Sequence, residues 1–173
     1  MTETATPRFR YLGVTDDCVV CEKCRKPNLK STVVLDILDA DGNSEGDPVY
    51  YGSTCAARVL NVTGRGASAR VLGLARAAHR ELVRNAYDGR KMLAAYGLPE
   101  TGEPTEQEVR VAAIQYAQIH GNARWANTQT GDDWRDIARS MINRKRAALA
   151  EAARLNVAVP TDDREMQRFI NTW

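Results

Sequence analysis

The chain has 173 residues, of which 43% are hydrophobic and 27% charged, and its net charge at pH 7 is +2. These proportions are typical of a soluble globular protein, and the length suits one domain or a small module joined to a larger one. So small a net charge does not by itself indicate a nucleic-acid-binding protein. No apolar run approaches the roughly 18 residues of a membrane span, and residues 1–10 lack the apolar core of a secretory signal, so we expect a cytoplasmic protein.

The first third of the chain carries the signals of β-structure. Residues 8–14, RFRYLGV, alternate between polar and apolar and predict a short strand. Residues 31–39, STVVLDILD, are rich in β-branched side chains, and the glycines, aspartates and proline that follow are typical of a turn. Because VYYG at residues 49–52 then reads as a returning strand, these two segments predict a β-hairpin with a long loop.

Helical signals follow the hairpin. Residues 53–64 begin with two common N-cap residues and end at a glycine, which predicts a short helix with Cys55 in its first turn. From residue 66 onward apolar residues recur at helical spacing, with a weak point at Gly89 and a stop at residues 97–99. The face that this spacing would bury consists of Val71, Leu74, Ala78, Leu82, Ala86, Leu93 and Tyr96.

Three further helices are predicted from residue 105 onward. Thr105 and Glu108 form a capping box that starts the first of them. A second begins after Asp132 or Asp133 and would bury Ile137, and a last one follows VPTDD, residues 159–163.

Three of the four cysteines, Cys18, Cys21 and Cys24, lie within seven residues, and Cys55 lies far downstream. In a cytoplasmic protein clustered thiols are more often metal ligands or redox groups than structural disulfides. A C-x2-C turn lets two sulfurs converge on one ion, and the predicted hairpin is followed by the helix that carries Cys55. We therefore predict a zinc ion bound by all four cysteines, and such a closed tetrahedral site is structural.

Alternatives to this ligand set stay open. If Cys18 points away, the fourth ligand is Asp16, Asp17, His79, His120 or water, and water would reopen the question of catalysis. C-x2-C-x2-C with a distant fourth cysteine is also similar to the ligand pattern of an Fe–S cluster. A disulfide, or no metal at all, is the remaining alternative.

The pattern C-x2-C-x-K-x2-L-K-x-T-V-x-L over residues 21–35, followed by YYGSTCAARVL, resembles small treble-clef or zinc-ribbon-like proteins of actinobacteria and their phages. The resemblance covers about residues 18–60. It implies zinc on Cys21, Cys24 and Cys55, and it implies no activity.

The sequence thus predicts an α+β fold with two parts. Residues 1–63 form an N-terminal zinc-bound β-hairpin module, similar to a treble clef. Residues 64–173 form a mainly α-helical region on which we expect that module to pack.

Basic residues gather in three places, and two of these groups are predicted to bind phosphate. One group lies beside the cysteine cluster, and the other lies on the first long helix, where the spacing 76-80-84 puts three guanidinium groups on one face. The predicted nucleic-acid-binding residues are Lys23, Arg25, Lys26, Lys30, Arg65, Arg70, Arg76, Arg80 and Arg84. A further cluster on the third long helix comprises Arg135, Arg139, Arg144, Lys145 and Arg146. An ordinary solvated helix face is the alternative for both helices.

These features predict a zinc-stabilised, non-enzymatic binding protein that contacts DNA or RNA. We expect it to be encoded by a phage or to have a regulatory role. The alternatives are a protein–protein adaptor or inhibitor that acts on a host protein, and an Fe–S redox-sensing regulator. An enzyme is the least supported reading, because no nucleophile or base accompanies the cysteines and no residue is predicted to be catalytic. No membrane partner is expected, and the oligomeric state is not indicated.

Overall fold

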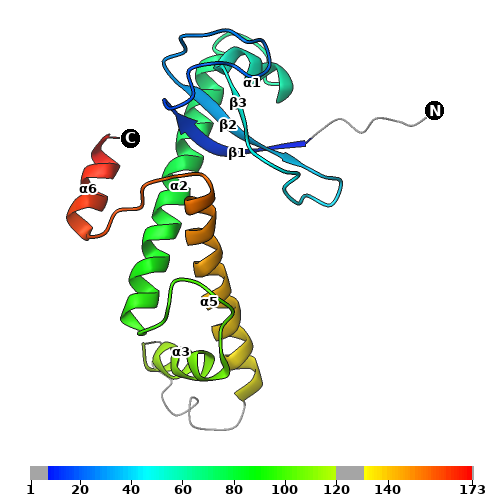
Figure 1. The fold of residues 1–173 in the computed structure, drawn as a ribbon. Helices are drawn as coiled ribbons and strands as arrows, with labels where there is room; N and C mark the ends of the chain where they lie inside the picture. Colours follow the sequence, from blue (N-terminus) through cyan, green and yellow to red (C-terminus); the bar gives the residue numbers. More distant parts are fainter. Residues whose placement is uncertain (1–7, 120–130, 173) are drawn as a thin grey trace. The chain divides into compact units, whose positions relative to one another are not determined.

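A computed structural model describes residues 8–119 and 131–172 of the chain, with the backbone alone for residues 131–134 (Figure 1). Within these residues the fold is α+β, as predicted, with one antiparallel three-stranded sheet and five helices. No helix in the described ranges is long and apolar enough to cross a membrane. The alternative ligand His120 lies outside the described residues.

The sheet has the strand order β1-β2-β3. Strand β1 (Arg8–Thr15) pairs with β2 (Thr32–Leu38), and β2 pairs with β3 (Val49–Tyr51), in both cases antiparallel. The register of the first pair shifts between Tyr11 and Gly13, where one residue of β1 lacks a partner. The three strands predicted from the sequence are therefore confirmed.

The described residues divide into two compact units, one up to Glu81 and the other Leu82–Thr172. The division falls inside helix α2 (Ala67–Ala95), which contributes residues to both units. The boundary predicted from the sequence lies earlier, between residues 63 and 64, just before this helix begins.

The core of the first unit lies between the sheet, the short helix α1 (Ser53–Val59) and the first turns of α2. Strand β2 is buried along most of its length, from Thr32 to Asp36. The buried apolar residues of this core are Val14, Val33, Leu35, Ala56, Ala57, Val71 and Ala75.

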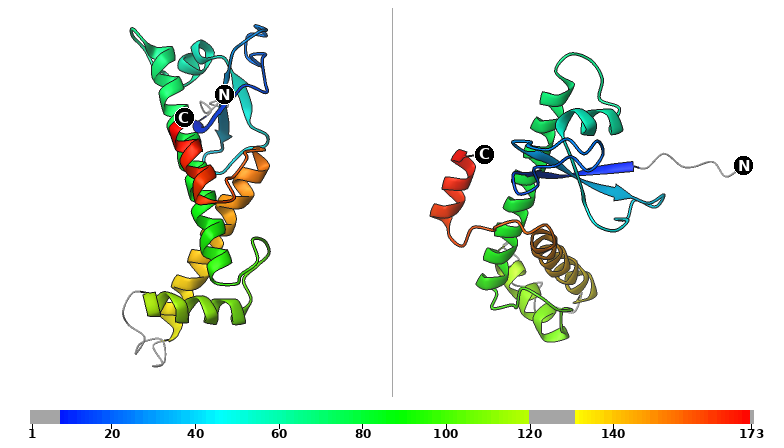
Figure 2. Two further views of the ribbon diagram at one scale, coloured as in Figure 1. Left: turned by 90° about the vertical axis from the view of Figure 1, so that its left-hand side faces the viewer. Right: turned by 45° about the horizontal axis from the view of Figure 1, so that its top comes forward.

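The second unit contains the rest of α2 together with α3 (Glu106–Ile119), α5 (Gly131–Arg154) and α6 (Asp163–Thr172). Figures 1 and 2 show α5 alongside the second half of α2. The main apolar cluster comprises Ala86, Leu93, Leu98, Val109, Ala112, Ala138, Ile142, Leu149 and Ala152. A smaller cluster of Val83, Tyr87 and Met166 packs α6 against α2.

The capping box predicted for α3 is confirmed by two reciprocal hydrogen bonds. The Thr105 amide donates to Glu108 Oε2 at 2.7 Å, and the Glu108 amide donates to Thr105 Oγ1 at 3.3 Å. Because these bonds satisfy two amide groups that a helix start leaves without intrahelical partners, they explain why α3 begins at this point.

Two residues predicted to be buried are exposed, namely Leu74 at 47% and Ile137 at 46%. In the first unit α2 buries Val71 and, one turn later, Ala75 instead of Leu74. Both positions have helical spacing from Val71, and the packing partners decide between them. The predicted weak point at Gly89 does not interrupt α2.

Arg146 does not belong to an exposed basic cluster, although it lies in the basic run of α5. Only 6% of this residue is exposed. Its guanidinium donates to Pro99 O at 3.0 Å, to Gly102 O at 2.9 Å and to Glu108 Oε1 at 3.2 Å. Arg146 therefore holds the loop before α3 on α5, and its charge is used inside the protein.

Candidate metal centre

The segment between β1 and β2 folds into a tight turn that carries two of the cysteines. The Cys21 amide donates to Lys26 O at 3.0 Å, and the Arg25 amide donates to Cys21 O at 2.7 Å. Arg25 adopts a positive φ of 60°, a left-handed conformation that costs a non-glycine residue about 1–2 kcal/mol. We call residues 21–26 the knuckle.

The knuckle is attached to β3 by hydrogen bonds in both directions. The Glu22 amide donates to Tyr50 O at 2.9 Å, and the Tyr50 amide donates to Glu22 Oε2 at 2.8 Å. After β3 the chain passes close to the knuckle at Gly52, since a Cβ atom there would lie 3.8 Å from Cys21 Cβ and 3.3 Å from Leu29 Cδ1. The spacing of the cysteines in the sequence does not predict these roles of Glu22 and Gly52. For Gly52 the sequence offers one signal, a glycine directly before the predicted start of a helix.

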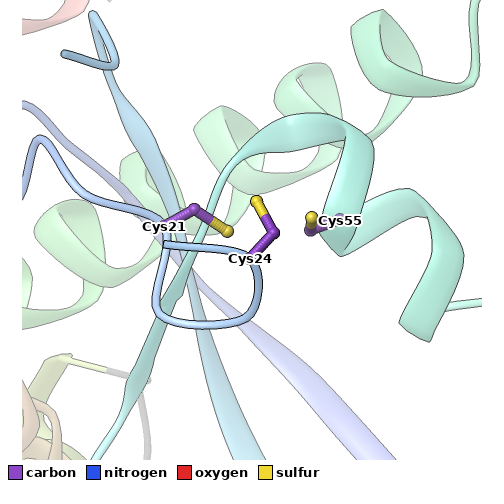
Figure 3. Close-up of side chains that lie close together, drawn as sticks. All are labelled: Cys21, Cys24 and Cys55. Atoms are coloured by element: carbon purple, nitrogen blue, oxygen red, sulfur yellow. The ribbon is translucent and has the colours of Figure 1, made fainter. Parts of the chain in front are cut away.

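Helix α1 begins at Ser53 and carries Cys55 in its first turn, as predicted. The Sγ atoms of Cys21, Cys24 and Cys55 all lie within 4.8 Å of one another, and Figure 3 shows the two knuckle cysteines and the helical one gathered in one place. Cys21 and Cys55 are buried, whereas Cys24 is exposed. Sulfurs bound at about 2.3 Å to one tetrahedral ion lie roughly 4 Å apart, so these three cysteines fit a single metal ion.

The surroundings shift the acidities of the two buried thiols in opposite directions. Burial raises the pKa of Cys21, but hydrogen bonds from the amides of Gly52, Cys24 and Lys23 and from the Cys24 thiol outweigh it and lower this pKa to about 7. Burial, together with hydrogen bonds to Cys24 and Cys21 and their negative charge, raises the pKa of Cys55 to about 11. Three thiolates this close repel one another, and a bound cation would relieve that repulsion.

The structure does not bring the fourth cysteine into this group. Cys18 is half-buried, and its thiol donates to Val20 O at 3.4 Å. In the described part of the chain, no further cysteine, histidine or carboxylate joins the three sulfurs. The assignment of Cys18 as a ligand stays a prediction.

The other candidate ligands lie elsewhere. Asp16 and Asp17 are exposed, and Asp17 accepts a hydrogen bond from Thr15 Oγ1 at 3.1 Å. His79 packs against Gly13 of β1, where an added Cβ atom would lie 3.1 Å from His79 Nδ1. Burial lowers the pKa of His79, which is therefore a neutral packing residue of the first unit at pH 7.

All nine basic residues predicted to bind nucleic acid are exposed: Lys23, Arg25, Lys26, Lys30, Arg65, Arg70, Arg76, Arg80 and Arg84. Arg70 also donates to Thr63 O at 3.2 Å, ahead of α2. Arg84 belongs to the second unit and the other eight to the first.

No protein family model, no curated protein and no solved structure matches the chain. Its function must therefore be inferred from its own side chains.

Proposed function

We propose that Cys21, Cys24 and Cys55 hold one zinc ion that stabilises the first unit, and that the protein is a non-enzymatic binding protein for DNA or RNA. The observation that carries this proposal is the meeting of three sulfurs from two separate segments, the knuckle and α1, within 4.8 Å. The four cysteines are free thiols, so this proximity does not arise from a disulfide. The order of knuckle, hairpin and helix supports a treble-clef-like module.

The spacing of the sulfurs favours one ion over an Fe–S cluster. In an Fe–S cluster at most two cysteines bind the same iron atom, so three cysteine sulfurs cannot all lie as close together as three sulfurs that share one ion. An all-sulfur ligand set favours a soft or borderline ion such as zinc over magnesium or calcium, which prefer oxygen ligands.

Exposed basic side chains of the knuckle and of α2 support binding to nucleic acid. Lys23, Arg25 and Lys26 lie on the knuckle itself and are all exposed. On α2, Arg76, Arg80 and Arg84 follow one another at intervals of four residues, which is the spacing of one helix face. Arginine and lysine side chains arranged in this way can neutralise successive phosphates of a nucleic-acid backbone.

The test combines metal analysis with binding measurements. We expect one zinc per chain, and we expect binding of a random DNA duplex, followed by fluorescence anisotropy, to weaken as salt is added. Each phosphate contact that is lost should lower the slope of log K against log salt by roughly 0.9. The variant that removes the knuckle charges combines Lys23→Gln, Arg25→Asn and Lys26→Gln. Asparagine is chosen at position 25 because it tolerates the left-handed backbone conformation found there.

A matched control removes three exposed charges from the second unit, at Arg110, Arg135 and Arg144. This control should retain the salt dependence of the unaltered chain. Equal losses in the two triple variants, or binding that does not respond to salt, would contradict the assignment of the knuckle to phosphate contacts.

One observation favours a protein partner as the second candidate function. Val19 and Val20, in the loop that leads into the knuckle, are 45% and 37% exposed. Adjacent exposed apolar side chains are more typical of a protein contact than of a phosphate contact. If the chain does not bind duplex or single-stranded nucleic acid, a single host protein should be retained by the unaltered chain and released by Val19→Ser with Val20→Ser.

A further inference from the structure

The group of three sulfurs has one ligand fewer than a closed zinc site. A structural zinc ion takes four ligands, whereas Cys21, Cys24 and Cys55 supply three. No other cysteine, histidine or carboxylate joins them among the described residues. Because Cys24 is exposed, solvent can reach the centre on its side.

Contacts in the preceding loop hold Cys18 outside the group. Its thiol is bonded to the carbonyl oxygen of Val20, at 3.4 Å. The backbone between them is anchored, since the Leu29 amide donates to Val19 O at 2.9 Å. Before its sulfur could become the fourth ligand, Cys18 would have to break its hydrogen bond to Val20 O, and its loop would have to shift.

The charges around the centre suit a negatively charged fourth ligand. A divalent ion with three thiolates has a net charge of −1, and a fourth, singly charged anion would make the net charge −2. The exposed residues Lys23, Arg25 and Lys26 on the same turn supply compensating positive charge. The only acidic residue of the knuckle, Glu22, is already engaged by the Tyr50 amide at 2.8 Å.

We propose that the fourth metal position is open to solution beside Cys24 and binds a thiolate from a small-molecule thiol; this inference rests on the metal site proposed above. In the exchange, the thiol releases its proton to solvent, a metal–sulfur bond forms and a metal–water bond breaks. The oxidation state of the metal does not change. Sulfur is favoured over oxygen donors because the three existing ligands make the site soft.

Cobalt(II) provides the probe, because it replaces zinc and its sulfur-to-metal charge-transfer absorption increases with the number of cobalt–sulfur bonds. The full-length chain is loaded with cobalt without air and without added thiol. The unaltered chain and Cys18→Ser should each bind one cobalt with the same absorption. β-Mercaptoethanol should raise this absorption by about a third, since three sulfur ligands become four. Ethylene glycol, its oxygen analogue, should leave the absorption unchanged.

Other outcomes would overturn the inference in distinguishable ways. If Cys18→Ser loses about a quarter of the absorption and the unaltered chain ignores β-mercaptoethanol, Cys18 is the fourth ligand. If both proteins ignore the thiol and absorb equally, another group of the chain fills the position. If the unaltered chain binds neither cobalt nor zinc, the proposed metal site itself is wrong. Cys55→Ser serves as the control for loss of a ligand from the group of three.

Discussion

The two compact units bring polar groups together in opposite ways. In the first unit three thiols meet within 4.8 Å, and no other described side chain of a metal-binding type joins them. In the second unit a buried guanidinium, that of Arg146, finds two carbonyl oxygens and one carboxylate within 3.2 Å. The protein itself completes the polar cluster around Arg146, whereas the three thiols could hold a metal ion.

This difference implies that the two units respond differently to their surroundings. The stability of the first unit should depend on metal and on the redox state of its thiols, because metal-binding free energy is part of the folding free energy of such a module. The second unit has two apolar clusters and a charge pair whose partners are all within the chain. Its stability should not depend on metal.

The largest effect is expected from removing a buried ligand. Cys21→Ser or Cys55→Ser should abolish metal binding and remove a contribution on the order of 10 kcal/mol from the first unit. Metal analysis and amide hydrogen exchange would measure this. Amides of β2 should lose protection, whereas those around Leu93 and Ile142 should keep it. A Cys21→Ser protein with full zinc content and an unchanged melting temperature would refute the assignment.

The second effect concerns the guanidinium of the second unit. Arg146→Met should lower the free energy of unfolding by about 3–5 kcal/mol, because it removes the guanidinium that pairs with Glu108 Oε1 and donates to two carbonyl oxygens. Urea unfolding followed by circular dichroism would measure the loss, and the zinc content should stay the same. Arg144→Met, at an exposed position two residues away, should change the stability by less than about 0.5 kcal/mol.

Replacing either of two glycines of α2, one in each unit, by alanine should change the stability by a smaller amount, and the two changes should have opposite signs. A Cβ atom on Gly89 would lie 3.1 Å from the Lys145 carbonyl oxygen, so Gly89→Ala should destabilise by about 1–3 kcal/mol. A Cβ atom on Gly73 would have nothing within 4 Å, so Gly73→Ala should stabilise by about 0.5–1 kcal/mol through helix propensity. Thermal unfolding of the two variants would test this, and equal shifts would contradict the close approach of α5 at Gly89.

The smallest effect is expected at α6. Lys91 donates to Asp163 Oδ1 at 2.8 Å and Tyr87 donates to the same atom at 2.5 Å, and these bonds lower the pKa of Asp163 below its ordinary value of 3.8. The stabilisation that the ionised Asp163 carboxylate contributes is therefore complete above about pH 4. It is lost as the pH falls through the lower pKa that Asp163 has in the folded protein.

The difference in melting temperature between the unaltered chain and Asp163→Asn should thus be small near neutral pH. It should vanish once Asp163 is protonated in the folded state. A difference that persists unchanged in acid would show that the carboxylate charge is not responsible.

Local sequence signals predicted much of the fold because they act over a few residues. The Thr105–Glu108 capping box, the alternation in β1 and the start of α1 before Cys55 each depend on neighbours in the chain. The proximity of Cys21, Cys24 and Cys55 was predictable for a related reason. A C-x2-C turn fixes the positions of two sulfurs relative to each other, so only the approach of Cys55 needed a longer argument.

Burial was less predictable, since it depends on partners that are distant in the sequence. Helical spacing cannot distinguish Leu74 from Ala75, and the core of the first unit takes the smaller residue. The basic run of α5 gives no sign that Arg146 is buried, because its partners are carbonyl oxygens that any residue could provide. The position of Cys18 likewise depends on contacts in its loop that spacing does not specify.

The left-handed conformation of Arg25 has a consequence for selection experiments. Glycine would adopt a φ of 60° without the strain that arginine bears, but it would remove a positive charge from the turn that carries Cys21 and Cys24. A library varied at this position and selected only for resistance to heat should therefore become enriched in glycine. The same library selected for its ability to capture an anionic partner should keep arginine, so the two selections would separate the requirements of folding from those of recognition at a single position.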